Sequence, residues 1–244
     1  NNESKSIALA CGSHSGSKLH SREAFKILWE YDIDINNLKC PKSKTSPLEH
    51  NCSGKHAAFL ATCKKMNWPL DSYLKGDHPL QIEIFRIVSE LLEIPSSEIN
   101  AERDDCGAPT LYLKLLEMSR LYSLLSSSEN AELEQISRAM TINPIMISDN
   151  NKFDTEIIKA SHGNVIGKGG AEGIQCLCKV NEGIGLALKV EDGSKRAKHA
   201  VSLHLLKQLE WISDLRIQDI EEKVFNFSEG VRLEVKGKLK FQES

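Results

Sequence analysis

Three short polar segments, each interrupted by glycine, contain the residues of this sequence that are best suited to chemistry. They span residues 11–16, 51–56 and 103–110, and a fourth such segment, residues 168–173, lies between two apolar runs. Each segment is expected at the end of a strand or the start of a helix, where binding and catalytic residues concentrate. We therefore predict a polar pocket that is built from several loops.

Cysteine and lysine in the second of these segments indicate a metal site. Cys52 and Lys55 are three residues apart at the predicted start of a helix, so they face the same side. A helix N-terminus stabilises a thiolate, and Cys106, at a second predicted helix start, is able to join it. Two thiolates with one or two nitrogen or oxygen donors suit zinc, and an open fourth position is typical of catalytic sites. Buried thiols and a surface lysine remain the alternative, because such widely separated cysteines are a weaker signal than a C-x-x-C pair.

Serine and lysine also occur at a spacing that is known from nucleophilic catalysis. Ser15 and Lys18 match the S-x-x-K pattern, in which the lysine helps to deprotonate the serine. No K-T-G triad follows, which counts against a β-lactamase. Ser13 and His14 are adjacent, so a serine–histidine dyad cannot be inferred from the sequence. A histidine in a polar loop is commonly a hydrogen-bonded scaffold residue.

Composition excludes several classes of protein. The 244 residues carry a net charge of −3, from 31 basic and 34 acidic side chains. The sequence therefore lacks the excess of basic residues that would indicate a nucleic-acid partner. No run of about 18 apolar residues predicts a membrane helix, and residues 1–4 do not start a signal peptide. Seven scattered cysteines indicate reduced thiols in a cytoplasmic protein rather than a disulfide framework.

The elements that must position the polar segments are read from periodicity. Residues 6–10 are expected to form a buried strand that leads into the first polar segment. The sequence predicts helices over 22–31, 56–65, 111–124, 131–140 and 194–212, with another opening at 77–79, and strands over 164–168, 173–190 and 230–241. Helices that precede a probable antiparallel sheet indicate an α+β fold, with the helices packed on the sheet.

The polar segments also resemble, in order, the sequence boxes of the rhizobial-type (class 3) L-asparaginase family. The most diagnostic box is similar to residues 50–57, His-Asn-Cys-Ser-Gly-Lys-His-Ala. The other matching boxes are residues 10–16, 77–81, 105–110, 138–140 with 143–144, 153–155, 168–173 and 188–193. The resemblance covers residues 6 to about 200, and a collinear series of this length is far more specific than a single motif.

The resemblance implies hydrolysis of L-asparagine to L-aspartate and ammonia, a fold similar to that of serine β-lactamases and glutaminases, and a homodimer. It implies that Cys52, Lys55 and Cys106 bind Zn²⁺ together with a water molecule. A lysine that binds a metal must be neutral. By the same resemblance, Ser13 is an active-site serine and Lys168 is a lysine of the catalytic cluster.

Roles for further residues follow as expectations. Ser13, Lys55 and Lys168 are the residues expected to form the proton and charge network. Asp105 and Glu172 are expected to bind the α-amino group of the substrate, with a structural role equally open, and His14 is expected to help to bind the substrate.

The sequence departs from the family in two places, which leaves three hypotheses. The stretch between Trp29 and His50 is short, and no residue before Ser13 matches the Ser-x-x-Lys tandem that the family carries near its N-terminus. We therefore expect residues 1–244 to form a single asparaginase-like domain that is truncated at its N-terminus. The hypotheses are an active asparaginase, a catalytically deficient zinc- or amino-acid-binding remnant, and a β-lactamase-like hydrolase that uses Ser15 and Lys18.

Overall fold

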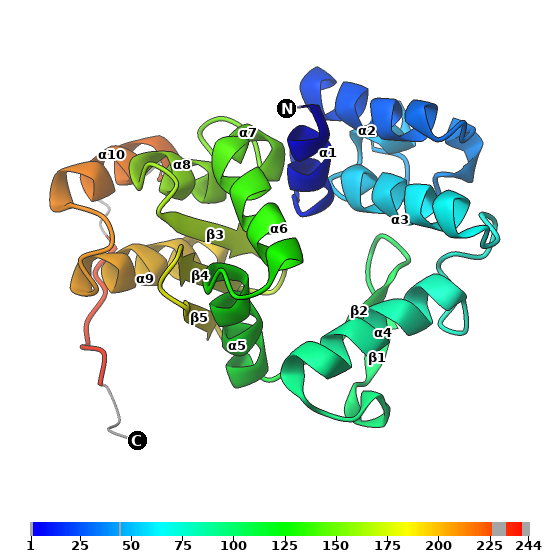
Figure 1. Ribbon diagram of the computed structural model, residues 1–244. Coiled ribbons are helices and arrows are strands. Elements are labelled where there is room, and N and C mark those ends of the chain that lie inside the picture. Colours follow the sequence, from blue (N-terminus) through cyan, green and yellow to red (C-terminus); the bar gives the residue numbers. More distant parts are fainter. Residues whose placement is uncertain (1, 44, 226–232, 241–244) are drawn as a thin grey trace.

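The computed structural model describes residues 2–43, 45–225 and 233–240, which form a mixture of helices and small antiparallel sheets (Figure 1). The helices are α1 (Asn2–Ala10), α2 (Lys18–Glu30), α3 (Ser53–Met66), α4 (Pro79–Leu92), α5 (Leu115–Ser126), α6 (Ala131–Ile142), α7 (Pro144–Ile147), α8 (Phe153–Ala160), α9 (Lys195–Gln208) and α10 (Asp214–Val224). The strands are β1 (Ala101–Arg103), β2 (Pro109–Leu111), β3 (Val165–Gly169), β4 (Ile174–Lys179) and β5 (Ile184–Lys189). The α+β prediction is therefore confirmed.

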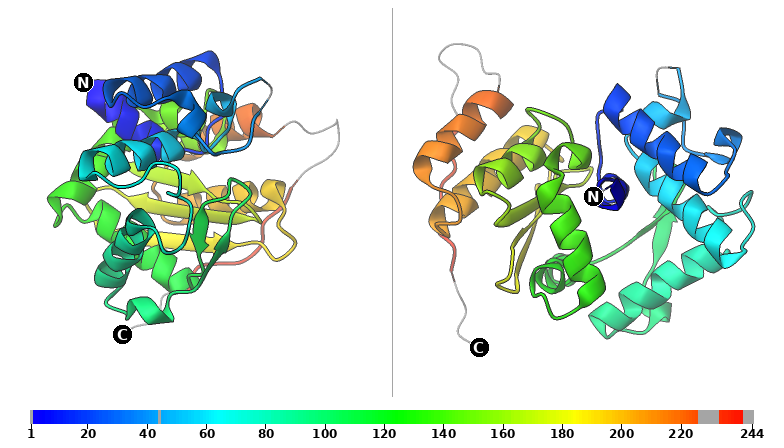
Figure 2. Two further views of the ribbon diagram at one scale, coloured as in Figure 1. Left: turned by 90° about the vertical axis from the view of Figure 1, so that its right-hand side faces the viewer. Right: turned by 45° about the horizontal axis from the view of Figure 1, so that its top comes forward.

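The larger sheet has the order β3-β4-β5, with both pairs antiparallel. Successive side chains of a strand point to opposite faces, and both faces here are apolar. Val165 and Leu177 pack among residues of α9 and α10, whereas Ile166 and Cys178 pack on the other face. Figure 2 shows the sheet between α9 and α10 on one side and α5 and α6 on the other. Burial on both faces fixes the register in which Lys168 lies opposite Cys176.

A second lobe contains α1 to α4 and the β1–β2 hairpin (Figures 1 and 2). The larger hydrophobic cluster runs through both lobes, because it joins buried residues of the first three helices to residues of α6, α7, α8 and the sheet. Leu9, Leu28 and Leu60 supply it from one lobe, and Ile147 and Ile166 from the other. The two lobes therefore share a core.

The prediction of a strand over residues 6–10 is wrong, because these residues form the end of α1. A short apolar run does not distinguish a strand from a buried helical turn, and alanine and leucine are strong helix formers. Ala8 and Leu9 are fully buried, and α1 packs against α3 and α6. The packing of α1 on α3 and α6 therefore favours a helix over a strand at residues 6–10.

Other boundaries also differ from the predictions. The helix expected from Leu111 begins at Leu115, because residues 109–111 pair with residues 101–103 as a hairpin. Neither α8 nor α10 was predicted. Residues 233–240 of the expected terminal strand have no regular secondary structure, and residues 230–232 and 241 lie outside the described residues. The predicted helix after residues 77–79 is confirmed, with the His78 side chain accepting a hydrogen bond from Leu80 N.

Among the described residues, the helices are too short or too polar to cross a lipid bilayer.

The crossing of α1 and α3 generates a prediction about stability. A Cβ atom at Gly54 would lie 2.5 Å from the Leu9 carbonyl oxygen and 2.6 Å from Leu9 Cγ. We expect Gly54→Ala to lower the free energy of unfolding by about 1–3 kcal/mol, because two packed helices must separate to admit the methyl group. Urea denaturation of the purified variant measures this change.

Gly76→Ala is the matched control, since nothing lies within 4 Å of its added Cβ. Its unfolding free energy should stay within about 0.5 kcal/mol of the wild-type value. Equal stability of the two variants would contradict the close packing at Gly54.

Candidate active site

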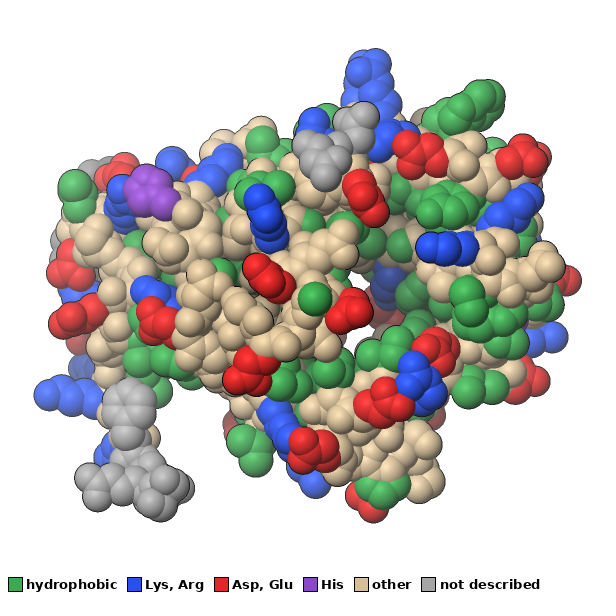
Figure 3. Space-filling model, viewed as in Figure 1, with side chains coloured by type: hydrophobic (Ala, Val, Ile, Leu, Met, Phe, Trp, Pro, Cys, Tyr) green, Lys and Arg blue, Asp and Glu red, His purple; other side chains and the backbone are tan. Residues whose placement is uncertain are grey.

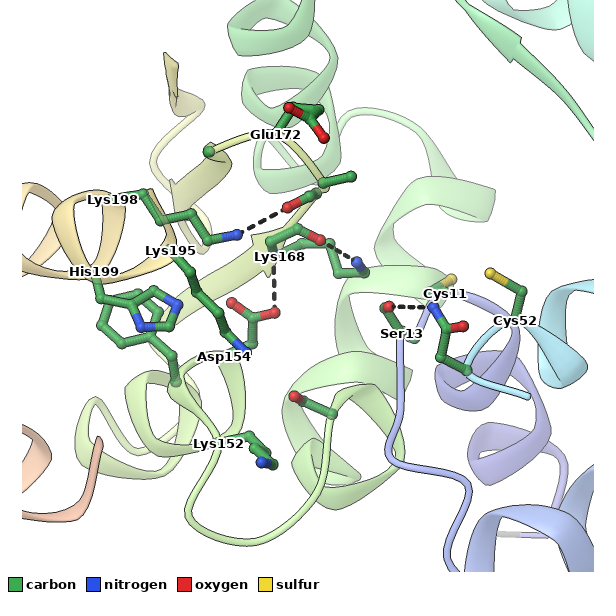
Figure 4. Close-up of a pocket in the computed structure, with 18 of the residues that line it drawn as sticks. Cys11, Ser13, Cys52, Lys152, Asp154, Lys168, Glu172, Lys195, Lys198 and His199 are labelled. Atoms are coloured by element: carbon green, nitrogen blue, oxygen red, sulfur yellow. Dashed lines mark hydrogen bonds between the residues drawn. The ribbon is translucent and has the colours of Figure 1, made fainter. Parts of the chain in front are cut away.

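A cavity of about 1090 Å³ lies where the two lobes meet. This is slightly above the usual size range of small-molecule sites, roughly 300–1,000 Å³. Its walls are formed by residues 10–13, 50–52, 55, 104–106, 148, 151–154, 168–173, 193, 195–196, 198–199 and 224–225. Figure 3 shows the surface hollowed between the lobes on one face, and Figure 4 shows the side chains that point into the cavity. All four polar segments of the sequence contribute to these walls.

Ser13 enters the cavity from the loop that follows α1. Its backbone N–H donates to the Ile147 carbonyl oxygen at 2.8 Å, which ties the loop to the end of α7. The Asn51 side-chain amide donates to Ser13 Oγ at 3.0 Å, and His14 N donates to the Asn51 carbonyl oxygen at 3.2 Å. The first two polar segments are thus bonded directly to each other. They hold an exposed serine hydroxyl at the wall of the cavity.

His14 lies behind this loop and does not line the cavity. The imidazole is 3% exposed and stacks on His20, with the ring centroids 4.6 Å apart. His14 Nδ1 accepts from Gly16 N at 3.1 Å, and its Nε2 lies 3.3 Å from Ser53 Oγ, whose own proton goes to the Leu48 carbonyl oxygen. His14 is therefore neutral, with the proton on Nε2. Burial, aided by His20, lowers its pKa to about 3. The geometry favours a scaffolding role over the expected contact with substrate.

The metal-ligand candidates meet on one side of the cavity. Cys52 caps the N-terminus of α3, Lys55 lies in its first turn, and Cys106 lies in the turn between β1 and β2. The donor atoms of Cys52, Asp104 and Cys106 all lie within 4.8 Å of one another. Lys55 Nζ is 3.4 Å from Cys106 Sγ and 3.8 Å from Asp104 Oδ2. The structure therefore brings together the three predicted ligands, and it adds a carboxylate.

Electrostatics within this cluster favour a negatively charged sulfur. A hydrogen bond from the Cys52 thiol is the main cause that lowers the pKa of Cys106, and Lys55 acts in the same direction. The same hydrogen bond and burial raise the pKa of Cys52, so one proton is held between the two sulfurs. Cysteine sulfur and carboxylate oxygen are common ligands of Zn²⁺. The chemistry of the donor set therefore fits this ion.

Lys168 enters the cavity from the end of β3, and two buried charges fix the turn after it. Gly169 N donates to Asp154 Oδ2 at 2.9 Å, while Lys198 Nζ donates to the carbonyl oxygens of Gly170 at 2.9 Å and Ile174 at 3.0 Å. Asp154 and Lys198 are 8% and 5% exposed, and burial lowers the pKa of Lys198. These bonds hold the turn that contains Glu172 against α9.

Ser13 and Lys168 point toward each other across the cavity (Figure 4). Lys168 Nζ donates to the Gly169 carbonyl oxygen at 2.5 Å, and Ser13 Oγ is bonded to Asn51, so each group has another partner in this state. Cys11 also lines this wall, and burial raises the pKa of its thiol to about 11. Cys11 is therefore protonated at neutral pH. Ser13 and Lys168 are therefore the two candidate catalytic residues on this part of the wall.

Sequence reasoning missed several residues of the cavity wall. Asp104 precedes the expected Asp105, and its position in the β1–β2 turn brings it to the cysteines. A basic group faces the cysteines from the other side and comprises Lys152, Lys195 and Arg196, of which Lys152 and Lys195 are labelled in Figure 4. These basic residues belong to no recognised motif. Lys195 and Arg196 begin α9, and Lys152 precedes α8.

One missed signal was present in the sequence. Residues 148–150 read Ser-Asp-Asn, an S-D-N sequence, and Ser148 lines the cavity. Ser15 Oγ donates to the Asp149 carboxylate, and Ser15 N donates to the Ser148 carbonyl oxygen at 3.0 Å. Neither Ser15 nor Lys18 lines the cavity. The geometry therefore does not favour the S-x-x-K pair of residues 15 and 18 as the nucleophile and base.

Most of the expected site residues line the cavity. Apart from His14, every residue to which a catalytic, substrate-binding or metal role was assigned lies on the cavity wall, namely Ser13, Cys52, Lys55, Asp105, Cys106, Lys168 and Glu172.

The buried His14 generates a prediction about acid stability. Its pKa falls from 6.5 to about 3 on folding, so the unfolded chain binds more protons between these values. The free energy of unfolding should therefore fall as the pH is lowered through this range, by up to about 1.4 kcal/mol per pH unit from His14 alone.

Denaturation at a series of pH values should give a shallower slope for His14→Asn, in which the amide oxygen replaces Nδ1. His162→Asn, at an exposed position, should retain the wild-type slope. Equal slopes for the wild type and His14→Asn would contradict this assignment.

Comparison with known proteins agrees with the resemblance seen in the sequence. The family described as L-asparaginase II matches residues 1–241. No match was found among the curated proteins. The match extends over both lobes and includes every segment that lines the cavity. The chain belongs to the L-asparaginase II family.

Proposed function

We propose that this protein is an L-asparaginase that hydrolyses L-asparagine to L-aspartate and ammonia by acyl transfer. Membership of the L-asparaginase II family supports an amidohydrolase that acts on a small substrate. The observation that carries the finer proposal is that Ser13 and Lys168 face each other across a cavity whose neighbouring wall holds a cluster of metal-ligand type (Figure 4).

The proposed reaction has two steps. Ser13 Oγ attacks the side-chain amide carbon, and its proton passes to the uncharged amine of Lys168. The C–N bond then breaks, and the leaving nitrogen takes this proton and departs as ammonia. Water hydrolyses the resulting ester, which releases aspartate and restores the Ser13 hydroxyl. The Asn51 amide lies beside Ser13 Oγ, to which it donates, and is proposed as a donor to the developing oxyanion. Such a donor is worth roughly 3–4 kcal/mol in enzymes where it has been measured.

Charges on the two walls are suited to orienting an amino acid. Asp105 and Glu172 are exposed carboxylates on the wall and are proposed to bind the α-amino group. Lys152, Lys195 and Arg196 are exposed cations on the same cavity and suit the α-carboxylate. If the carboxylates bind the α-amino group and the cations bind the α-carboxylate, the bound asparagine has one orientation. In the proposed orientation its side-chain amide points toward Ser13 and Lys168.

We also propose that Cys52, Lys55 and Cys106 bind Zn²⁺, with Asp104 as a further oxygen donor or as the partner of Lys55. Lys55 would bind as the free amine. Zinc, when bound, supplies a positive charge that polarises or orients a substrate and also joins residues 52–55 to residues 104–106. The rest of the chemistry belongs to Ser13, Lys168 and the charged walls.

The fold is further proposed to be similar to that of serine β-lactamases and glutaminases. The homodimer that the resemblance implies, and the cytoplasmic location and single domain that the sequence leads us to expect, remain predictions.

A second function is favoured by one observation. Ser13 Oγ and Lys168 Nζ each bond to another group instead of to each other. This arrangement suits a protein that binds zinc or an amino acid without turnover. Calorimetry with L-aspartate together with an ammonia-release assay separates the two functions, because only the enzyme releases ammonia from L-asparagine.

The role of Ser13 is tested by substitution. Ser13→Ala should lower kcat for L-asparagine by more than roughly 1,000-fold with little change in KM, because the nucleophile acts in the transition state. Lys168→Met should have an effect of similar size. Ser15→Ala is the matched control and should retain activity, since Ser15 lies two residues away and outside the cavity. Full activity of Ser13→Ala would overturn the mechanism.

The zinc site is tested by metal content, independently of activity. Protein purified without chelator should contain about one zinc per chain by plasma mass spectrometry, and Cys52→Ala should lose it. Cys11→Ala is the control, because Cys11 is also half-buried in the same cavity but lies outside the cluster. Zinc retained in Cys52→Ala, or lost equally in both variants, would exclude the proposed ligand set.

A further inference from the structure

His56 is a fully buried histidine on α3 whose two ring nitrogens have very different surroundings. Nδ1 lies 2.7 Å from the Tyr73 hydroxyl oxygen, and Tyr73 is also fully buried. The same hydroxyl accepts a hydrogen bond from Lys39 N at 2.9 Å. Among the described contacts of this hydroxyl, Nδ1 is the one acceptor within reach of the phenol proton, so we assign this proton to a hydrogen bond from Tyr73 to Nδ1.

The acceptor role of Nδ1 fixes the tautomer of His56. A neutral imidazole carries one proton, so this proton lies on Nε2. Nε2 is buried and has no hydrogen-bond partner of ordinary geometry among the described residues. An unsatisfied buried donor costs about 1–3 kcal/mol, so an orphaned N–H in a native core calls for an explanation.

The position of His56 places this donor beside the cysteine cluster. His56 N donates to the Cys52 carbonyl oxygen at 3.1 Å, so His56 follows Cys52 by one turn and lies on the same face of α3. Cys106 is only 2% exposed and lies within 4.8 Å of the Cys52 sulfur. The imidazole also contributes to lowering the pKa of Cys106 through a side-chain interaction.

We propose that His56 is a positioning residue that directs its Nε2–H at the Cys106 sulfur from the buried side of the cluster, with Tyr73 holding it in the tautomer that can do so. His56 is not a metal ligand here, since the group of atoms close enough to share an ion comprises Cys52, Asp104 and Cys106 among the described residues. The inference rests on the proposed zinc site.

The arrangement forms a chain of donors that ends at the metal-binding sulfur. Lys39 N–H donates to Tyr73, Tyr73 donates to His56, and His56 donates toward Cys106. Consecutive hydrogen bonds polarise one another in a buried environment. Partners outside the ligand shell orient the ligands and typically alter metal affinity by 10–100-fold when removed.

Zinc affinity in a series of variants tests this role. His56→Phe fills the space without a donor, and His56→Gln places an amide N–H near the position of Nε2. Competition with a chromophoric chelator should show zinc binding weakened by roughly 10–100-fold in His56→Phe and restored to near the wild-type value in His56→Gln.

His78→Phe is the control for loss of a buried histidine. His78 is 4% exposed and bonds to Leu80 N and to the Pro69 carbonyl oxygen, away from the cluster. This variant should lose stability and keep zinc affinity. Unchanged affinity in folded His56→Phe, or no recovery in folded His56→Gln, would overturn the proposal.

A measurement without metal separates this inference from the zinc proposal. In the metal-free protein, ¹⁵N spectra of the histidine rings should show His56 protonated at Nε2, and Tyr73→Phe should produce a mixture of tautomers. Wild-type protein that takes up no zinc but shows this tautomer, with a ¹³Cβ shift at Cys106 that changes in His56→Phe, would refute the zinc site and support the hydrogen bond. The Nδ1–H tautomer in the wild type would refute the role of His56.

Discussion

The contact between the last turn of α1 and the first turn of α3 determines where the reactive groups of this protein lie. Gly54 presses against the Leu9 carbonyl group with no room for a side chain. The two helix ends are therefore close enough for the loop after α1 to bond to the loop before α3, through Asn51 and Ser13. A serine and a cysteine that are far apart in the sequence thus enter one cavity.

The remaining groups reach the cavity by two different routes. The β1–β2 turn brings Asp104 and Cys106 to the start of α3, within the helix lobe. Lys168 comes from the sheet, where the register of β3 and the buried side chains of Asp154 and Lys198 hold the turn that follows it. The thiols of Cys52 and Cys106 therefore reach the cavity from the helix lobe, and the amine of Lys168 reaches it from the sheet lobe.

The segments that line the cavity could be predicted from residue types and spacing, the roles expected of Ser13 and Lys168 came from the family resemblance, and much of the fold could be predicted from neither. The loops that carry Ser13, Cys52, Cys106 and Lys168 were identified because glycine and polar residues interrupt apolar runs there. The helical state of residues 6–10 depends on packing against α3 and α6, which no local pattern encodes. The roles of Asp104 and His56 depend on contacts between distant segments, and the basic residues at the start of α9 have no pattern of their own.

The division of the cavity between two lobes links ligand binding to the rigidity of the whole chain. A molecule that contacts the Ser13 wall and the Lys168 wall together bridges both lobes (Figure 4). Such a molecule binds the native arrangement and has no comparable site on the unfolded chain, so it raises stability by mass action as its concentration exceeds the dissociation constant. Thermal shift is consequently a direct screen for ligands of this protein, and it reports occupancy of the cavity whether or not the ligand is consumed.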